Sequence, residues 1–198
     1  MITLYHRPNT RATRFIFLLE ELEAPYILRL VTTRTRDGGG AVDPANPHPH
    51  GKVPVISDDG VVVFESAAIA LYLTDRFPKN GIGPASGDPA RGAYLSWLAY
   101  YAGVFEPAFV SKFMGWEVPR GTAGWVPLEE MLPAVLGRLA QAPYLTGERF
   151  SAADVLYATS FALFAGSPLL PKSPLIDDYV GRVTARPAFA RAMAKQSG

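Results

Sequence analysis

The chain has 198 residues, a formal net charge of +1 and no cysteine. Its 18 glycines and 18 prolines together make up about 18% of the residues, short of the roughly 25–30% that marks low-complexity or disordered chains. Hydrophobic residues are 48% and charged residues 19% of the total, which is an ordinary globular balance. The length allows one domain or two small ones.

These numbers exclude several classes of protein. Without cysteine there is no disulfide framework, no Cys-ligated zinc or iron–sulfur site and no thiol nucleophile in the chain. The near-neutral charge lacks the signature of a nucleic-acid or anionic-membrane partner. The N-terminus has no signal-peptide pattern, and no apolar run approaches the roughly 18 residues of a spanning helix. We therefore expect a soluble, cytoplasmic protein that binds neither nucleic acid nor membrane.

The first part of the chain alternates strands and helices. Apolar runs predict strands at Ile2–His6 and Tyr26–Val31, on either side of a helix over Arg11–Glu23 that Asn9 or Thr10 could cap. A strand–helix–strand unit of this size implies a parallel pair with a right-handed crossover.

A loop over residues 32–50 separates this unit from a predicted hairpin. Lys52–Ser57 and Val61–Phe64 are the expected strands, with a tight turn at Asp59-Gly60 between them. A helix over Glu65–Phe77 follows. The first 77 residues therefore predict an α/β domain.

Prolines and glycines mark a linker over residues 78–87, and only helices are predicted after it. Asp88 is the expected cap of the first, with Pro89 at its first position and a kink at Pro107. A further helix is predicted over Leu128–Ala140. Two more are expected to start where a polar residue precedes proline, at Ser173-Pro174 and Arg186-Pro187. The predicted organisation is an α/β domain over 1–77 and an all-α domain over 88–198.

The segment Gly51-Lys52-Val53-Pro54-Val55 is unusual because proline cannot donate to a strand ladder. A cis Val53–Pro54 bond would accommodate it and would turn the backbone of Val53 outward to pair with a peptide-like ligand. The alternative is an edge-strand proline with no role.

Glu65 and Ser66 open the predicted helix that follows the hairpin. Free N–H groups and the dipole at a helix N-terminus favour anions, and a neighbouring carboxylate could hold an ammonium group. Together they suit an α-amino-acid head group, although a plain capped helix would look the same.

With these motifs in this order, the sequence resembles the soluble glutathione S-transferases over essentially its whole length. The resemblance rests on GKVPV at 51–55, ESAAIALYL at 65–73, the Pro/Gly linker, the helical second half and a capping-box pattern at Ser151-Ala152-Ala153-Asp154. It implies a thioredoxin-like first domain that binds glutathione as cosubstrate, a helical second domain that builds the electrophile pocket, no metal, and a homodimer.

The resemblance also assigns roles to residues by motif. Val53 would pair with the cysteinyl backbone of glutathione before cis-Pro54, and Glu65 with Ser66 would take the γ-glutamyl group. Lys52, with His48 or His50, would face the glycyl carboxylate. The family pattern NP-x-GK-x-P is longer here, Asn46-Pro47-His48-Pro49-His50-Gly51, and an exposed proline-rich loop is the alternative for the histidines.

Family members activate the glutathione thiol with Tyr, Ser or Cys near the end of the first strand. The stretch from Pro8 to Arg14, followed by LLEEL, looks like the serine-type pattern with Thr10 at the serine position. A hydroxyl donor and a helix N-terminus both favour a thiolate. Tyr5 is the second candidate, and Asn9, Arg11 or a backbone N–H are the others. Thr10 as a simple helix cap and Tyr5 as a core aromatic are the structural alternatives.

The electrophile pocket is expected on the long helix after the linker and, at Trp116, just beyond it. Its candidates are aromatic side chains, although residues at this spacing also fit a helical core: Tyr101, Phe105, Phe109 and Trp116.

The resulting expectation is a glutathione transferase acting on small hydrophobic electrophiles. A glutathione-dependent peroxidase or disulfide reductase on the same scaffold, and a non-catalytic binding module, are the alternatives.

Overall fold

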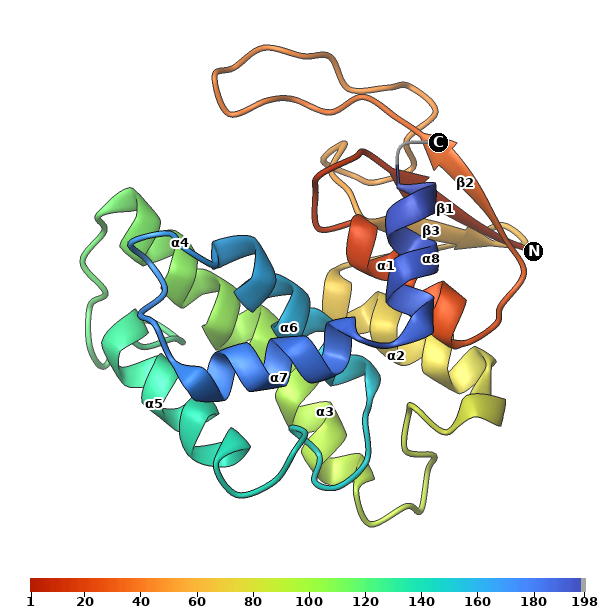
Figure 1. Ribbon diagram of the computed structural model, residues 1–198. Coiled ribbons are helices and arrows are strands. Elements are labelled where there is room, and N and C mark those ends of the chain that lie inside the picture. Colours follow the sequence, from red (N-terminus) through yellow and green to blue (C-terminus); the bar gives the residue numbers. More distant parts are fainter. Residues whose placement is uncertain (197–198) are drawn as a thin grey trace. The chain divides into compact units, whose positions relative to one another are not determined.

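The computed structural model describes residues 1–196, and its first part holds one mixed four-stranded sheet (Figure 1). The strands are β1 (Ile2–His6), β2 (Tyr26–Leu30), β3 (Val55–Asp58) and β4 (Val61–Phe64), in the order β2-β1-β3-β4. β1 pairs with β2 in parallel and with β3 antiparallel, and β4 closes the hairpin. This is the predicted α/β, thioredoxin-like arrangement.

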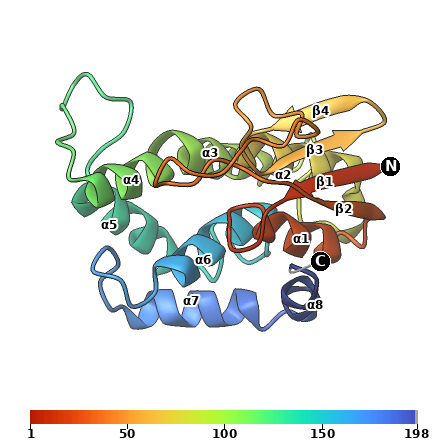
Figure 2. The same cartoon turned by 90° about the horizontal axis from the view of Figure 1, so that it is seen from above.

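Three helices accompany this sheet. They are α1 (Thr13–Glu21), α2 (Ser66–Arg76) and, from the far end of the chain, α8 (Pro187–Lys195); a short 3-10 turn, η1, covers Pro78–Asn80. Alternate residues of β1 are buried, and the apolar side of α1 is buried as well. Figure 2 shows β1, α1 and α8 as successive layers.

The remaining helices form a second group. They are α3 (Arg91–Tyr100), the π-helical η2 (Tyr101–Phe105), α4 (Glu106–Met114), α5 (Leu128–Leu139), α6 (Ala152–Phe164) and α7 (Pro174–Thr184). α6 is buried on nearly every side and carries the centre of this group's core. This confirms the prediction that the second half of the chain is built from helices.

The chain divides into two compact units. The α/β unit comprises Met1–Asn80 together with the chain from Arg186 onward, and the helical unit comprises Gly81–Ala185. The first boundary falls inside the predicted linker. The last helix differs from the prediction, because α8 packs against α1 and belongs with the α/β unit. Sequence periodicity identifies a helix but does not identify the surface that it covers.

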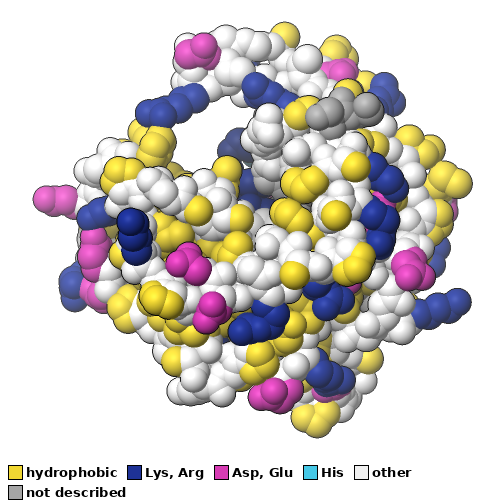
Figure 3. All heavy atoms as spheres, in the orientation of Figure 1, with side chains coloured by type: hydrophobic (Ala, Val, Ile, Leu, Met, Phe, Trp, Pro, Cys, Tyr) yellow, Lys and Arg dark blue, Asp and Glu magenta, His cyan; other side chains and the backbone are white. Residues whose placement is uncertain are grey.

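Charged pairs explain why α8 packs there. Arg186 forms a two-pronged contact with the Glu21 carboxylate (2.7 and 2.8 Å), and Arg191 and Lys195 both bind Glu20. The ring of Phe17 meets that of Phe189 edge to face at 5.4 Å. In Figure 3 basic side chains lie along this helix on the visible face.

Several predicted boundaries are corrected. The first helix begins at Thr13 with Ala12 at its N-cap position, so neither Asn9 nor Thr10 is the cap residue. β3 begins at Val55, because Pro54 has no N–H to give to the ladder. The helix after the linker begins at Arg91 rather than Pro89.

Two other predicted helix starts are confirmed, and a third signal, Pro107, coincides with an irregular stretch of helix. Ser151 and Asp154 form the capping box of α6, and Ser173 precedes Pro174 at the start of α7. Instead of a simple kink, the π-helical segment η2 lies just before Pro107. Proline lacks the N–H that would continue the regular α-helical ladder there.

Candidate functional site

The predicted glutathione-binding segments meet at one end of the sheet. Tyr5 pairs with Val55 between β1 and β3, and Val55 pairs with Phe64 between β3 and β4. The carboxyl end of β1, the chain entering β3 and the chain leaving β4 therefore lie side by side. This register places Val53-Pro54 next to Glu65 and the start of α2.

The N-terminus of α2 is open to a ligand. The first helical hydrogen bond runs from the N–H of Ile69 to the carbonyl of Glu65 (2.9 Å), so the N–H groups of the preceding turn lie outside the helical ladder. Glu65 itself has φ 71°, ψ 129°, in the left-handed half of backbone space that side chains disfavour. Its side chain is exposed and Ser66 is buried beside it.

The chain entering β3 shows the predicted cis Val53–Pro54 bond. Pro54 is buried, Val53 half-buried and Lys52 exposed. The carbonyl of Lys52 accepts a hydrogen bond from the side-chain amide of Asn46 (3.1 Å), which fixes the approach to the strand.

The two histidines of this loop differ in surroundings. His48 is buried, and its ring lies 5.4 Å from that of Phe64 and 6.0 Å from that of His50, which is exposed. Burial is the main cause that lowers the pKa of His48; the positive charges of His50 and Lys52 lower it further, while the Glu65 carboxylate opposes them. The pKa of His48 therefore responds to the charges of Glu65 and Lys52 as well as to its burial.

The loop between β1 and α1 carries the candidate thiol activators. The Thr10 hydroxyl donates to the carbonyl of Arg7 (2.6 Å) and accepts the N–H of Ala12 (3.3 Å). Asn9 has φ 57°, a conformation that asparagine tolerates better than most residues. Arg11 is exposed. Thr10 thus closes the turn into α1, and its hydroxyl can donate a hydrogen bond to a thiolate only after rotating away from the carbonyl of Arg7.

Tyr5 lies on the sheet face opposite to the buried residues of β1. It is half-buried, and the guanidinium carbon of Arg29 lies 5.8 Å from its ring centroid. It is therefore not part of the core beneath α1. Both Tyr5 and Thr10 stay candidates for thiol activation.

Two buried polar atoms that flank the loop between β1 and α1 were not predicted from the sequence. Among residues 1–196, the buried Thr13 hydroxyl, at the first residue of α1, and the buried Nδ1 of His6, at the last residue of β1, have no hydrogen-bond partner. The other ring nitrogen of His6 donates to the carbonyl of Gln196 (2.9 Å), and burial lowers the pKa of His6. No sequence pattern announces these contacts, since one depends on the docking of α8.

Three of the four predicted pocket aromatics lie in the core of the helical unit. Tyr101, Phe105 and Phe109 are 0, 0 and 2% exposed, and their rings pack in sequence at 5.3 and 5.0 Å. The Tyr101 hydroxyl donates to Glu106 (2.6 Å) and pairs with Ser160. Trp116, by contrast, is 58% exposed.

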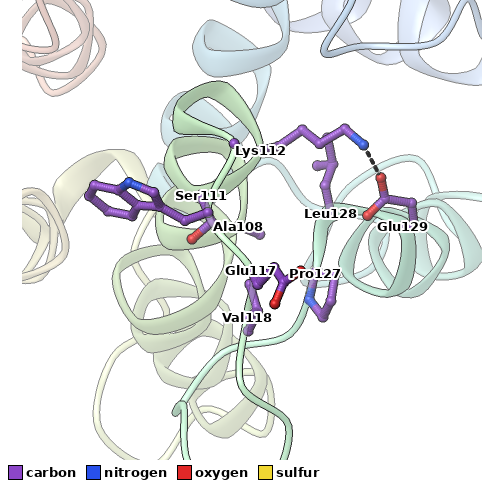
Figure 4. Close-up of a pocket in the computed structure, with 10 residues that line it drawn as sticks. Ala108, Ser111, Lys112, Glu117, Val118, Pro127, Leu128 and Glu129 are labelled. Atoms are coloured by element: carbon purple, nitrogen blue, oxygen red, sulfur yellow. Dashed lines mark hydrogen bonds and ion pairs between the residues drawn. The ribbon is translucent and has the colours of Figure 1, made fainter.

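Trp116 borders a pocket of about 520 Å³ between the end of α4 and the start of α5 (Figure 4). Ala108 and Ser111 line it on one side, and Pro127 and Leu128 on the other. Figure 4 shows the ion pair of Lys112 with Glu129 at its rim. The indole N–H of Trp125 donates to the Ser111 hydroxyl (3.0 Å) and ties the intervening loop to α4.

Within residues 1–196, no group of three or more His, Asp or Glu side chains is arranged to hold a metal ion. In the same part of the chain, none of the helices has both the length and the apolar character needed to cross a membrane.

Comparison with protein families gives two matches. The model of the glutathione S-transferase N-terminal domain matches residues 10–76, and that of the glutathione S-transferase C-terminal domain matches residues 127–187. A solved glutathione transferase from Methylococcus capsulatus has 31% sequence identity and a TM-score of 0.80, over 100% of this chain and 99% of that one. The chain belongs to the glutathione S-transferase family.

Relatives within this family differ in what they are described to do. Glutathione S-transferase 3 of Schizosaccharomyces pombe is 37% identical over 101 residues, but the match spans only 50% of this chain and 40% of that protein. The disulfide-bond oxidoreductase YfcG of Escherichia coli is 28% identical over 98% of this chain and 95% of its own length. A sphingomonad glutathione S-transferase solved in complex with glutathione has 27% identity and a TM-score of 0.75, covering 98% of both chains.

Proposed function

We propose that this glutathione S-transferase binds glutathione at the end of the sheet and transfers its thiolate to small hydrophobic electrophiles. The register of β1, β3 and β4 is the observation that supports this most, because it brings Val53, Glu65 and Ser66 together. The complex of the sphingomonad relative with glutathione supports the same ligand.

Each end of the tripeptide has a matching group in this proposal. The open N-terminus of α2 with the Ser66 hydroxyl takes the γ-glutamyl carboxylate, and the Glu65 carboxylate takes its ammonium group. The backbone of Val53 pairs with the cysteinyl residue in the manner of an added strand. Lys52 and His50 offer positive charge or N–H donors to the glycyl carboxylate.

For the thiol we propose Thr10 as the hydrogen-bond donor, with Asn9 and Arg11 as electrostatic helpers and Tyr5 as the competing donor. A drop of roughly two units from a thiol pKa of about 8.5 makes thiolate the main form at pH 7 and corresponds to about 2.7 kcal/mol. Breaking the Thr10–Arg7 hydrogen bond costs about 1 kcal/mol of that gain. Thr10 is therefore a weaker donor than a hydroxyl that is already free.

The electrophile site is proposed around Trp116 and the pocket beside α4. An exposed indole offers a large apolar face to an aromatic or alkyl substrate. The proposal includes a homodimer, as the family resemblance implies, and a cytoplasmic location, as expected from the sequence composition and the N-terminal pattern.

Calorimetry with glutathione and titration of the bound thiol by its ultraviolet absorbance test this function. Binding at millimolar glutathione or below is expected, with a thiol pKa that rises in Thr10→Ala and stays low in Thr10→Ser. A pKa that is unchanged in Thr10→Ala and raised in Tyr5→Phe would assign the donor to Tyr5. If no glutathione binds at millimolar concentration, the proposed enzymatic function is wrong, and a non-catalytic binding module becomes the better interpretation.

A disulfide reductase is the second candidate, and the similarity to YfcG over nearly the whole chain favours it. In that reaction two glutathione thiols give two electrons and two protons to a substrate disulfide and leave as glutathione disulfide. The chain has no cysteine, so both thiols come from glutathione. Conjugation of a chlorodinitrobenzene and reduction of a small dialkyl disulfide, compared at equal glutathione, decide between the two; hydroperoxide reduction is the third assay.

A further inference from the structure

The segment Asn46–Lys52 is held by hydrogen bonds between alternate residues. The side-chain oxygen of Asn46 accepts the N–H of His48 (3.0 Å), and Nδ1 of His48 accepts the N–H of His50 (3.0 Å). The side-chain amide of Asn46 closes the loop on the carbonyl of Lys52 (3.1 Å). Lys52 and Val53 precede β3, so the strand ladder does not hold this approach; these side-chain bonds hold it, together with the backbone bond from the N–H of Gly51 to the carbonyl of His48 (2.9 Å).

The contact from His50 defines the protonation state of His48. A ring nitrogen accepts a hydrogen bond only when it carries no proton, so this imidazole is neutral with its proton on Nε2. Protonation would place a second N–H on the ring, facing the N–H of His50. The bond would then become a repulsive contact between two donors.

Burial makes that change consequential. His48 is 7% exposed, with the ring of Phe64 on one side and that of His50 on another. Its charged neighbours are Glu65, which favours the protonated ring, and Lys52 and His50, which oppose it. Burial, Lys52 and His50 together outweigh Glu65, so the pKa of His48 is below its ordinary value and the ring is neutral at pH 7.

We propose that His48 is a positioning residue for glutathione, which holds Lys52 and Val53 in their binding arrangement only while its imidazole is neutral. The inference rests on the proposed glutathione site. Protonation of His48 releases the N–H of His50, loosens the approach to β3 and weakens binding in acid. A histidine that instead attracted a glutathione carboxylate by its own positive charge would strengthen binding in acid, which is the opposite sign.

Calorimetry with S-methylglutathione between about pH 5 and pH 7 measures this sign, since the ligand's carboxyl and amino groups keep their charges over that range. The wild-type affinity is expected to fall toward acid, by up to about tenfold for each pH unit below the pKa of His48. In His48→Asn the amide oxygen can accept the same N–H two residues on, as in an Asx turn, and it does not titrate. Its affinity is expected to show no fall toward acid.

His50→Gln is the matched control, because it removes the neighbouring histidine but keeps Nδ1 of His48. It should retain the fall in affinity toward acid, whatever its absolute affinity. An affinity that rises toward acid in His50→Gln, or a His48→Asn variant that weakens toward acid as much as the wild type, overturns the proposal.

Hydrogen exchange of the His50 amide tests the hydrogen bond from this amide to His48 directly, without ligand and without any variant. After correction for the intrinsic dependence of exchange on pH, protection of this amide in the wild type is expected to fall as His48 is protonated. Constant protection overturns the inference. If S-methylglutathione binds at no pH, the proposed function fails, and so does the proposed effect of His48 on ligand binding. Exchange of the His50 amide still supports or overturns the pH-dependent hydrogen bond between His50 and His48.

Discussion

Gly51 has a backbone φ of +60°, which residues with a side chain rarely adopt. A Cβ at this position would lie 2.3 Å from Cγ1 of Val42 and 2.6 Å from its Cγ2. Gly51→Ala is therefore expected to displace the approach to β3. Its cost should exceed the roughly 1 kcal/mol that the left-handed conformation alone costs an alanine, and the proposed glutathione binding should weaken.

Urea unfolding and calorimetry check this, with Gly60→Ala as the control. Gly60 has φ +91° in the turn of the β3–β4 hairpin, and a Cβ there would meet nothing within 4 Å. Equal costs for the two variants would show that Val42 moves aside and that the contact is unimportant.

Like Gly51, Asp154 determines a local structure, in this case the start of α6. Its carboxylate accepts the N–H groups of Leu145 and Ser151 (2.9 and 2.8 Å) and the hydroxyl of Tyr179 (2.8 Å), all within the buried core of the helical unit. Asp154→Ala leaves these donors without an acceptor and should destabilise this unit by about 3 kcal/mol. The exposed Asp178→Ala is the control, and thermal unfolding followed by circular dichroism is the measurement. A loss below about 1 kcal/mol would mean that water replaces the carboxylate.

At the scale of elements, we expect the contact between α1 and α8 to depend on pH. Burial alone would raise the pKa of Glu20, but hydrogen bonds from Lys195, Tyr26 and Arg191 outweigh it and leave the pKa below its ordinary value. A carboxylate with a lowered pKa stabilises the fold above its unfolded pKa, and that stability is lost as pH falls through the folded value. We expect α8 to loosen in acid, below about pH 4.5.

Glu20→Ala should produce the same loosening at neutral pH, at a cost of about 2 kcal/mol, because two charged donors and a hydroxyl lose their acceptor. The exposed Glu23→Ala should change little. Hydrogen exchange of the α8 amides reports the effect directly. Equal protection of α8 in Glu20→Ala and the wild type would show that apolar contacts alone hold the helix.

The sequence predicted these elements well where the signal is local. The hairpin turn at Asp59-Gly60, the capping box at Ser151 and the start of α7 each depend on residues within a few positions of one another. The residues of the candidate site came from the motifs at 51–55 and 65–73 through the family resemblance, and their roles stay a prediction. What it missed depends on contacts distant in sequence: the ring of His6 meets the backbone of Gln196, 190 residues away.

The start of α1 shows a second kind of limit. Thr10 was a reasonable cap by residue type, yet its hydroxyl bonds the carbonyl of Arg7 and the helix begins three residues later. Threonine can satisfy several local hydrogen-bond patterns, and the backbone of the turn decides among them. The aromatic residues from Tyr101 to Phe109 were equally ambiguous, because the spacing that suits a pocket also suits a core.

At the scale of the whole molecule, removal of α8 tests how the chain is divided. A chain ending at Ala185 loses the Arg186–Glu21 contact and the packing of Phe189 on Phe17. Amide protection in the α/β unit is expected to fall at least about tenfold, which corresponds to about 1.4 kcal/mol, while the helical unit keeps its protection. Hydrogen exchange with mass spectrometry separates the two. A loss confined to the helical unit would contradict the division.

The return of α8 has a consequence for the order in which the protein can form during its synthesis. The helical unit is one uninterrupted stretch of chain, whereas the α/β unit opens the chain and is finished only by its final helix. A ribosome therefore releases every residue of the helical unit before the last helix of the α/β unit has emerged. Until then the face of α1 that carries Phe17 and Glu20 lacks its cover. Of the two units, the one whose synthesis starts first is thus the one completed last.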